Sequence, residues 1–280
     1  MNIKILSDST CDLSPAQLAE LNVDLARLTI VKGDETFLDG DTIFPADIFA
    51  HVAAGGDLCS TTAYNVGEYE DLFGKFASEY DGIIHISLGS GFSSSYQNAC
   101  LAAEEYPNVR VVDSQNLSTG QGHVVLEACR LAKELEDLDE IAARLKDFAT
   151  RVEASFVLDQ LKYMAKGGRC SSAAALGANL LNLKPCIEVK NGKMSVVKKY
   201  RGSYAKCLAS YVKDRLADRE DILRNELFLT YTPVDDECLS AVKNAIAEYG
   251  HFETVYETTA GCTVSCHCGP GTLGVLFVRK

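Results

Sequence analysis

Hydroxyl-rich segments follow three apolar stretches of the chain, and their residue types could bind an acidic ligand. They span Ser7–Asp12, Ser87–Ser95 and Asp113–Gln115. Hydroxyl groups and the free backbone N–H groups at a helix start both donate hydrogen bonds to anions, and the helix dipole adds attraction. The serines Ser93–Ser95 could also simply cap a following helix. One serine suffices for a cap, so we favour a ligand role for this loop.

The elements that must position these segments alternate between strand and helix patterns. Short apolar strands are predicted at Ile3–Ser7, Gly82–Ser87 and Val109–Asp113, with no polar alternation, as in parallel strands buried on both faces. The carboxyl ends of such strands meet at one edge of the sheet, where ligands bind. A small exposed β excursion is predicted around residues 32–41. The intervening helices are predicted at Pro15–Leu21, Pro45–Ala54, Gly67–Glu79, Tyr96–Glu105, Gly120–Glu136 and Leu138–Thr150.

The second half of the chain has a different pattern. Asn191-Gly192 between two apolar runs predicts a tight hairpin. We therefore expect a two-lobed α/β protein with its ligand in the cleft between the lobes. Residues 1–160 would form a Rossmann-like lobe with a parallel sheet, and residues 161–280 an α/β lobe with a mixed or antiparallel sheet. Further strands are predicted at Ala154–Leu158, Glu226–Tyr231, Phe252–Glu257 and Leu273–Val278, and helices at Ser171–Leu181, Ser203–Ala217 and Asp235–Tyr249.

Histidines are the main candidates for a second kind of ligand contact. His85 lies inside an apolar strand and is expected in the core, whereas His123 follows a glycine-rich turn and could reach a ligand. His267 precedes Gly269-Pro270-Gly271, and we expect it at the end of a strand, presented at the rim of the sheet.

Cysteines beside His267 raise the alternative of a metal site. On an extended strand Cys266 and Cys268 would share one face and His267 would point to the other, so we expect Cys262, Cys266 and Cys268 to be packing residues. No metal and no cofactor are predicted. A dinucleotide is disfavoured because the third glycine of the fingerprint is replaced by Ser94. The alternative of a small-molecule phosphotransferase or hydrolase, using His267 or His123 with the Ser93 loop, stays open.

The formal net charge of −12 over 280 residues disfavours nucleic acid as a partner. Between Gln160 and Lys213, however, eleven Lys or Arg accompany a single acid, Glu188. This basic segment could be a solvated surface, or a docking face for an acidic protein, an anionic membrane surface or phosphates. No apolar run is long enough to span a membrane, and the apolar start is too short for a signal peptide, so we expect a cytoplasmic protein.

Short motifs along the whole chain, in order, resemble those of the DegV family, a bacterial fatty-acid-binding group. The family pattern is two α/β lobes with a fatty acid between them. Each motif is unspecific alone, and their order carries the resemblance. They are Ile5–Asp12, Phe92–Ala99, Val111–Ser114, Lys166-Gly167-Gly168-Arg169, Lys184-Pro185, Tyr200-Arg201 and His267-x-Gly269-Pro270-Gly271.

The resemblance implies a non-catalytic carrier that binds a long-chain fatty acid. Carried over by motif, Thr61, Ser93 and His267 would hold the carboxylate, with Thr62 and Ser95 nearby. Two positions depart from the family pattern: Thr61-Thr62-Ala63-Tyr64 replaces T-S-Q-P, and Ser93-Ser94-Ser95 replaces S-G-T. The hydroxyl groups are retained at these positions, but the substitutions could change the shape of the pocket, so the sequence does not determine the preferred acyl chain.

The resemblance also implies a protein partner. Some members of the family present their lipid to a separate kinase, which phosphorylates the carboxylate to an acyl phosphate. Arginines of the K-G-G-R and Y-R motifs serve that partnership, which points here to Arg169 and Arg201. Both lie in the basic segment.

Overall fold

A parallel four-stranded sheet forms the first half of the molecule. The computed structural model describes residues 1–175 and 183–280. The strand order is β2-β1-β6-β7, and every neighbouring pair is parallel, as predicted. β2 was not predicted because it is a four-residue edge strand with two half-buried residues and no apolar run. The bounds are β1 Ile3–Asp8, β2 Val23–Ala26, β6 Gly82–Ser87 and β7 Val109–Asp113.

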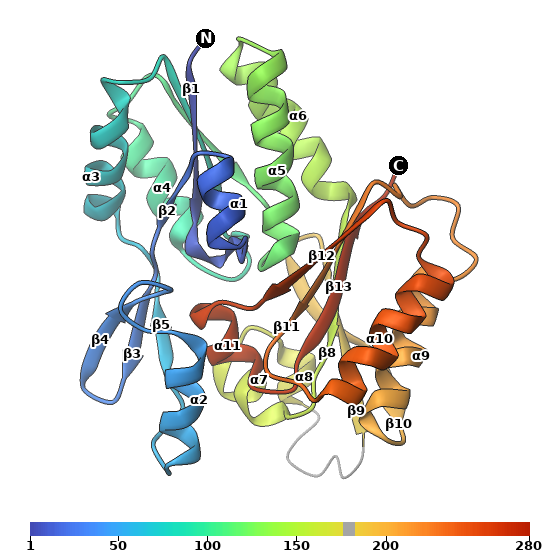
Figure 1. Cartoon of the computed structure of the whole chain (residues 1–280). Coiled ribbons are helices and arrows are strands. Elements are labelled where there is room, and N and C mark those ends of the chain that lie inside the picture. Colours follow the sequence, from blue (N-terminus) through green and yellow to red (C-terminus); the bar gives the residue numbers. More distant parts are fainter. Residues whose placement is uncertain (176–182) are drawn as a thin grey trace.

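Helices cover both faces of this sheet (Figure 1). Side chains alternate along β1, so Leu6 packs with α3 and α4, and Ile5 packs in the cluster that includes α5 and α6. Local chemistry starts these helices where the sequence predicts: Ser14 caps α1 before Pro15, and Asn65 forms a capping box with Glu68 at α3. The bounds are α1 Pro15–Glu20, α3 Val66–Ala77, α4 Ser95–Ala103, α5 Thr119–Glu134 and α6 Leu138–Arg151.

A six-stranded mixed sheet forms the second half, in the order β10-β9-β8-β13-β11-β12. Only β11 and β12 are parallel, so the expected mixed sheet is confirmed. β8 belongs to this sheet, because it pairs with β13 and β9, although it precedes residue 160 in the chain. The boundary between the lobes at residue 160 stays a prediction. The bounds are β8 Val152–Val157, β9 Leu183–Lys190, β10 Lys193–Arg201, β11 Glu226–Tyr231, β12 Thr254–Thr259 and β13 Leu273–Val278.

The two faces of the mixed sheet have different neighbours. α9 (Tyr204–Leu216) and α10 (Asp236–Tyr249) cover the outer face (Figure 1). Inner-face side chains such as Ala154 and Leu276 join the same apolar cluster as α5, so the two lobes share a core. α7 (Leu161–Gly167) and α8 (Ser171–Ala174) follow β8. The helix predicted at Ser171–Leu181 coincides with α8 at its start, and its remainder from residue 176 lies outside the described residues.

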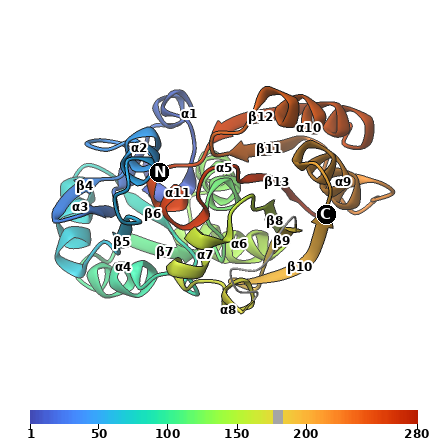
Figure 2. The same ribbon diagram turned by 90° about the horizontal axis from the view of Figure 1, so that it is seen from below.

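A small third sheet and a few short helices complete the fold. A three-stranded antiparallel sheet, β4-β3-β5, confirms the β excursion around residues 32–41. Seen from below, α11 and α7 lie between the two large sheets (Figure 2). No helix in the described part of the chain is long and apolar enough to cross a membrane. The bounds are β3 Thr29–Lys32, β4 Glu35–Leu38, β5 Ser60–Thr62, α2 Pro45–Ala53, α11 Cys262–Cys268 and a 3-10 turn at Ser9–Cys11.

Candidate functional site

A cavity of about 360 Å³ lies where β5, the Ser93 loop, α7, β10 and α11 meet. This volume falls in the range of small-molecule sites, about 300–1,000 Å³. Its apolar wall is formed by Leu28, Leu88, Phe92, Leu117, Met164, Met194 and Val264. Its polar wall includes the predicted residues Thr61, Thr62, Ser93, Arg169 and His267.

Two of the predicted residues do not line this cavity. Ser95 is fully buried at the start of α4, where its Oγ lies 2.9 Å from Ser93 Oγ. Arg201 is exposed at the end of the edge strand β10. The structure therefore brings together Thr61, Thr62, Ser93, Arg169 and His267, places Ser95 directly behind Ser93, and leaves Arg201 on the surface.

Thr61 and His267 meet across the cavity wall although 206 residues separate them in the chain: Thr61 Oγ1 lies 2.9 Å from His267 Nε2. Burial, with the nearby Arg169 as the second cause, lowers the pKa of His267 from 6.5 to about 4. The imidazole is therefore neutral at pH 7. It can exchange hydrogen bonds with a hydroxyl or an acid, but the positive charge at this wall comes from Arg169.

His267 lies on a helix, and the prediction of a strand ending at this residue is wrong. α11 forms because carboxyl oxygens of two aspartates of the first lobe accept hydrogen bonds from the N–H groups at its start. Asp39 accepts from Cys262 N at 2.9 Å and Thr263 N at 3.2 Å, and Asp12 accepts from Gly261 N at 2.9 Å. Gly269, with φ of 76°, follows the last residue of the helix. No local pattern reveals these partners, which lie more than 220 residues away.

The two carboxyl groups are themselves buried and hydrogen-bonded. Asp39 also accepts from Thr263 Oγ1 at 2.7 Å and Ser9 Oγ at 3.1 Å, and it is 2% exposed. Asp12 accepts from Ser118 Oγ at 2.6 Å. Burial raises the pKa of Asp12 from 3.8 to about 8, with the neighbouring Asp39 as a further cause. A Cβ atom on Gly261 would come within 2.8 Å of Asp12 Oδ1, so this approach of helix to carboxylate requires glycine.

Gly167 of the Lys166–Arg169 motif packs directly against the His267 ring. A Cβ atom at this position would overlap Nδ1 of the imidazole. The next residue, Gly168, has φ of 69° and ends α7 in the left-handed conformation, with open space where its Cβ would be. In this motif the first glycine allows close packing of the His267 ring, and the second allows the left-handed backbone that ends the helix.

The Ser93 loop is held by backbone contacts as well as by hydroxyls. Ser93 Oγ accepts from Ser95 N at 3.1 Å, whereas Ser94, at the N-cap position of α4, makes no side-chain cap. Gly91 packs against the carbonyl of Gly192 at the tip of the β9–β10 hairpin, and a Cβ at Gly91 would overlap that oxygen. The hairpin predicted from Asn191-Gly192 therefore supports the loop that carries Ser93.

The other two buried histidines are core residues. His85 is fully buried and lies 3.1 Å from Asp8 Oδ1, as expected for a core histidine. The hypothesis that His123 contacts the ligand is wrong. It is fully buried in α5, its Nε2 lies 3.0 Å from the carbonyl oxygen of Leu276, and its ring packs edge-on against Phe228. Sequence alone places His123 on a helix but does not reveal which face it occupies.

The cysteines near His267 are packing residues. On the helix, Cys262 and Cys266 lie one turn apart and pack in an apolar cluster with Ile43 and Cys59. The expectation that Cys266 and Cys268 share one face of a strand is therefore wrong. Burial raises the pKa of both thiols, so they stay protonated. Within residues 1–175 and 183–280, no three His, Cys, Asp or Glu side chains are grouped to hold a metal ion.

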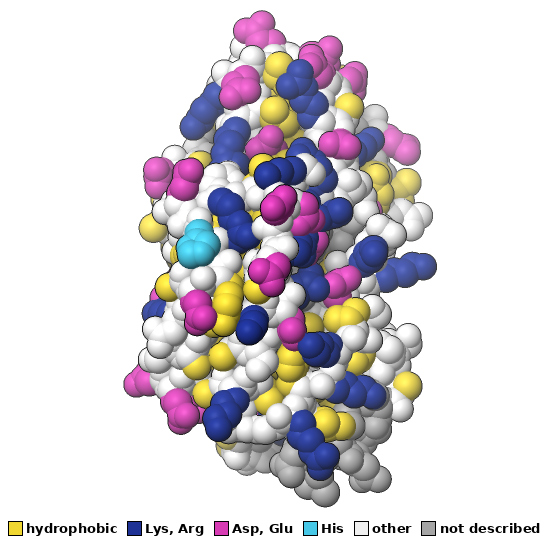
Figure 3. All heavy atoms as spheres, turned by 90° about the vertical axis from the view of Figure 1, so that its right-hand side faces the viewer, with side chains coloured by type: hydrophobic (Ala, Val, Ile, Leu, Met, Phe, Trp, Pro, Cys, Tyr) yellow, Lys and Arg dark blue, Asp and Glu magenta, His cyan; other side chains and the backbone are white. Residues whose placement is uncertain are grey.

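The basic segment does not form a single uniform patch. Figure 3 shows basic side chains spread over the face that carries α9 and α10, with acidic ones among them. Lys198 pairs with Asp214 at 2.6 Å, and Lys184 pairs with Asp159. Arg169 donates from Nη1 to the carbonyl of Gly167 at 2.7 Å and lines the cavity.

Comparison with known proteins identifies the family of the chain. Residues 2–280 match the family model described as uncharacterised protein, DegV family. The chain belongs to the DegV family. A DegV domain-containing protein of Clostridium acetobutylicum is 31% identical over 294 aligned residues, which cover 99% of each protein.

Solved DegV structures share the whole fold. A DegV family protein from Thermus thermophilus, described for its fatty acid binding, matches with a TM-score of 0.92 and 27% identity over 100% of both chains. DegV of Bacillus subtilis, described as a fatty acid binding protein, matches with a TM-score of 0.82 and 25% identity, again over 100% of both. The family and the two-lobed α/β fold expected from the sequence are confirmed.

Several residues that line the cavity of this DegV-family protein were not predicted. Leu117 follows the third hydroxyl-rich segment, and Met164 and Met194 lie in the basic segment. Flexible apolar side chains are common at such walls, but no spacing distinguishes them from core residues. Thr10, from the first hydroxyl-rich segment, lines the cavity, and its Oγ1 donates to Gln121 Oε1 at 2.7 Å.

Proposed function

We propose that this protein is a non-catalytic carrier that binds one long-chain fatty acid in the 360 Å³ cavity. Thr61, Ser93 and His267 hold the carboxylate, and Arg169 supplies the positive charge. The cavity carries the proposal because hydroxyls and a neutral imidazole occupy one wall and aliphatic side chains the other. The DegV relatives described as fatty acid binding proteins support the same ligand class.

The energetics of such a site divide between the two ends of the ligand. Burying an acyl chain gains about 0.8 kcal/mol per methylene, so about a dozen methylenes give on the order of 10 kcal/mol before the costs of association. Each hydrogen bond to the carboxylate adds about 1.5–3 kcal/mol. The tail therefore dominates affinity, and the head contacts fix the end that faces outward.

Extraction of the purified protein tests the proposal. Organic extraction followed by mass spectrometry should release a long-chain acid in about equal amount to the protein, and the delipidated protein should take up added long-chain acid. A protein that is lipid-free and takes up no such acid would contradict the proposed function.

A substitution at Gly167 tests the position of His267 in binding. Gly167→Ala should weaken fatty acid binding by about 10-fold, the loss expected when one hydrogen bond to a charged group is disrupted. The physical reason is the overlap of the added methyl group with the imidazole. Gly168→Asn is the matched control, because asparagine tolerates the left-handed conformation and the space there is open. Equal affinities of the two variants, measured by titration calorimetry, would contradict this role of His267.

We propose further that the carrier presents its lipid to a kinase subunit, through Arg169 at the cavity and Arg201 on the surface. Arg201→Glu should lower kinase-dependent acyl phosphate formation at least 10-fold, because it places negative charge where an acidic partner would dock. The same variant should leave fatty acid affinity within about 2-fold, since Arg201 does not line the cavity. Arg169→Glu should lower both, because Arg169 lines the cavity. Phosphorylation that proceeds unchanged would remove the kinase docking proposal. If Arg201→Glu instead abolishes binding to vesicles of anionic lipid, the basic surface contacts a membrane rather than a kinase.

A further inference from the structure

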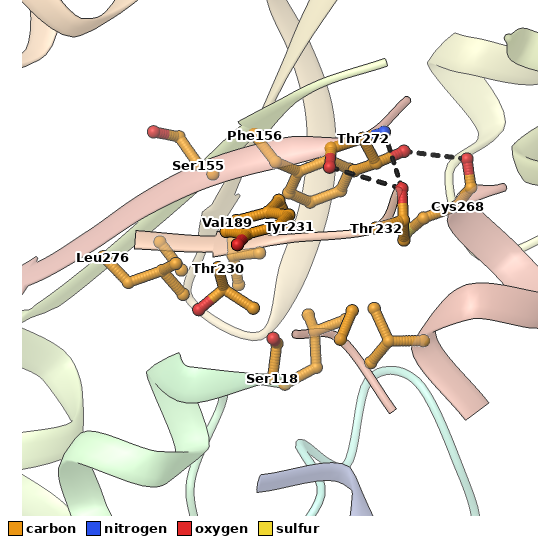
Figure 4. Close-up of a pocket in the computed structure, with 15 residues that line it drawn as sticks. Ser118, Ser155, Phe156, Val189, Thr230, Tyr231, Thr232, Cys268, Thr272 and Leu276 are labelled. Carbon is orange, nitrogen blue, oxygen red and sulfur yellow. Dashed lines mark hydrogen bonds between the residues drawn. The ribbon is translucent and has the colours of Figure 1, made fainter. Parts of the chain in front are cut away.

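A second, smaller cavity of about 30 Å³ lies against the inner face of the mixed sheet (Figure 4). Leu117, Val264 and Cys268 border both this chamber and the main cavity. These three side chains are therefore the boundary between the two spaces. A long ligand that begins at Ser93 can reach the chamber only by passing them.

A small residue on β8, Ala154, contributes to the hollow. Ala154 of β8 lies opposite Leu276 of β13, and Phe156 lies opposite Gly274. Opposite residues of an antiparallel pair share a face, so small and large side chains alternate diagonally on the inner face. At Gly274 the neighbouring Phe156 and Leu276 already approach the position of the missing side chain, so the unfilled space lies beside the small side chain of Ala154.

The hydroxyl groups around the chamber are already occupied by internal hydrogen bonds. Thr230 Oγ1 lies 2.5 Å from Thr119 Oγ1 and 2.9 Å from Thr258 Oγ1. Thr232 Oγ1 donates to the carbonyl of Gly269 at 2.9 Å and accepts from Thr272 N at 2.8 Å. Figure 4 shows the bonds among Thr232, Thr272 and Cys268.

The chamber has the size for water but not the polar partners. A cavity that holds one water needs about 10–15 Å³ and two to four polar partners. The volume here, about 30 Å³, is sufficient. Because the threonine hydroxyls bond to one another and to the backbone, the chamber suits a hydrocarbon end better than water or a polar group.

We propose that this chamber receives the methyl end of the bound acyl chain, and that Ala154 limits the chain length that fits. The inference rests on the fatty acid binding proposed above. It defines the ligand as a straight-chain monocarboxylic acid with an unsubstituted end. An acid with a hydroxyl or second carboxyl group at its far end would bury a polar group without a partner, and its affinity should be at least 10-fold lower.

Filling and enlarging the chamber should shift the length preference in opposite directions. Affinities of the delipidated protein for saturated acids of 10 to 18 carbons are measured by calorimetry. Ala154→Val should weaken binding of the longest acid that the unmodified protein accepts by at least 10-fold, and leave acids several carbons shorter within 2-fold. Phe156→Leu, which removes volume at the same wall, should improve the relative affinity for longer acids.

Ala209→Val is the matched control, because Ala209 on α9 packs against the outer face of the same sheet. Its length profile should coincide with that of the unmodified protein. If the unmodified protein binds fatty acids but neither Ala154→Val nor Phe156→Leu alters the length profile, the chamber inference is overturned and the carrier function stands. If the unmodified protein binds none of the acids, the carrier function itself fails.

Discussion

Replacing Asp39 by alanine should lower the free energy of unfolding by about 3–5 kcal/mol. The carboxylate accepts hydrogen bonds from Cys262 N, Thr263 N, Thr263 Oγ1 and Ser9 Oγ. Its removal leaves these buried donors without their acceptor, and each such donor costs about 1–3 kcal/mol. Because α11 carries His267, fatty acid affinity should fall as well. Urea unfolding and calorimetry measure the two effects.

Asp41→Ala provides the comparison for Asp39→Ala. Asp41 lies two residues further along the same turn but is exposed, so its replacement should change the unfolding free energy by less than about 0.5 kcal/mol. Asp39→Asn keeps one acceptor oxygen and should fall between the two. Indistinguishable unfolding curves for Asp39→Ala and Asp41→Ala would show that the start of α11 does not depend on this carboxylate.

Asp12 should make the protein less stable as the pH rises toward 8. Its pKa is raised by burial from 3.8 to about 8, so between these values the folded protein holds a proton that the unfolded chain has lost. Stability therefore decreases with rising pH across this window, by at most about 1.4 kcal/mol per pH unit. Between pH 6.5 and 8 the expected decrease is about 2 kcal/mol.

Asp12→Asn should abolish this decrease. The amide oxygen can still accept from Gly261 N, its NH₂ group can donate to Ser118 Oγ, and asparagine tolerates the φ of 51° at this position. The comparison starts at pH 6.5 because the lowered pKa of His267, about 4, costs stability as the pH falls below 6.5. Parallel stability profiles of the two proteins from pH 6.5 to 8 would contradict a protonated Asp12.

The features that could be predicted from the sequence depend on local patterns. Continuous apolar strands predict a parallel sheet, and the hydroxyl-rich segments at their ends predict a polar rim, because both follow from residue types a few positions apart. Asn191-Gly192 determines its hairpin by itself. The ordered motifs placed Thr61, Ser93 and His267 in one site, and the structure joins Thr61 and His267 by a contact across 206 residues.

The features that could not be predicted depend on long-range register and distant partners. α11 appears strand-like in sequence because the residues that cap it, Asp12 and Asp39, lie in the other lobe. The hollow beside Ala154 depends on the register of β8 and β13, which places Leu276 opposite Ala154. The burial of His123 depends on which face of α5 meets β13, and the pattern of α5 does not determine this.

The position of β13 constrains how the protein folds during synthesis. This strand follows the other five strands of the mixed sheet in sequence, yet it lies between β8 and β11 in the middle of that sheet. Until β13 is synthesised, β8–β9–β10 and β11–β12 are two separate fragments with unpaired edges, and unpaired edges promote aggregation. The parallel sheet needs no strand from this part of the chain and can form earlier. The late pairing of β13 is therefore the step that joins the mixed sheet into one unit.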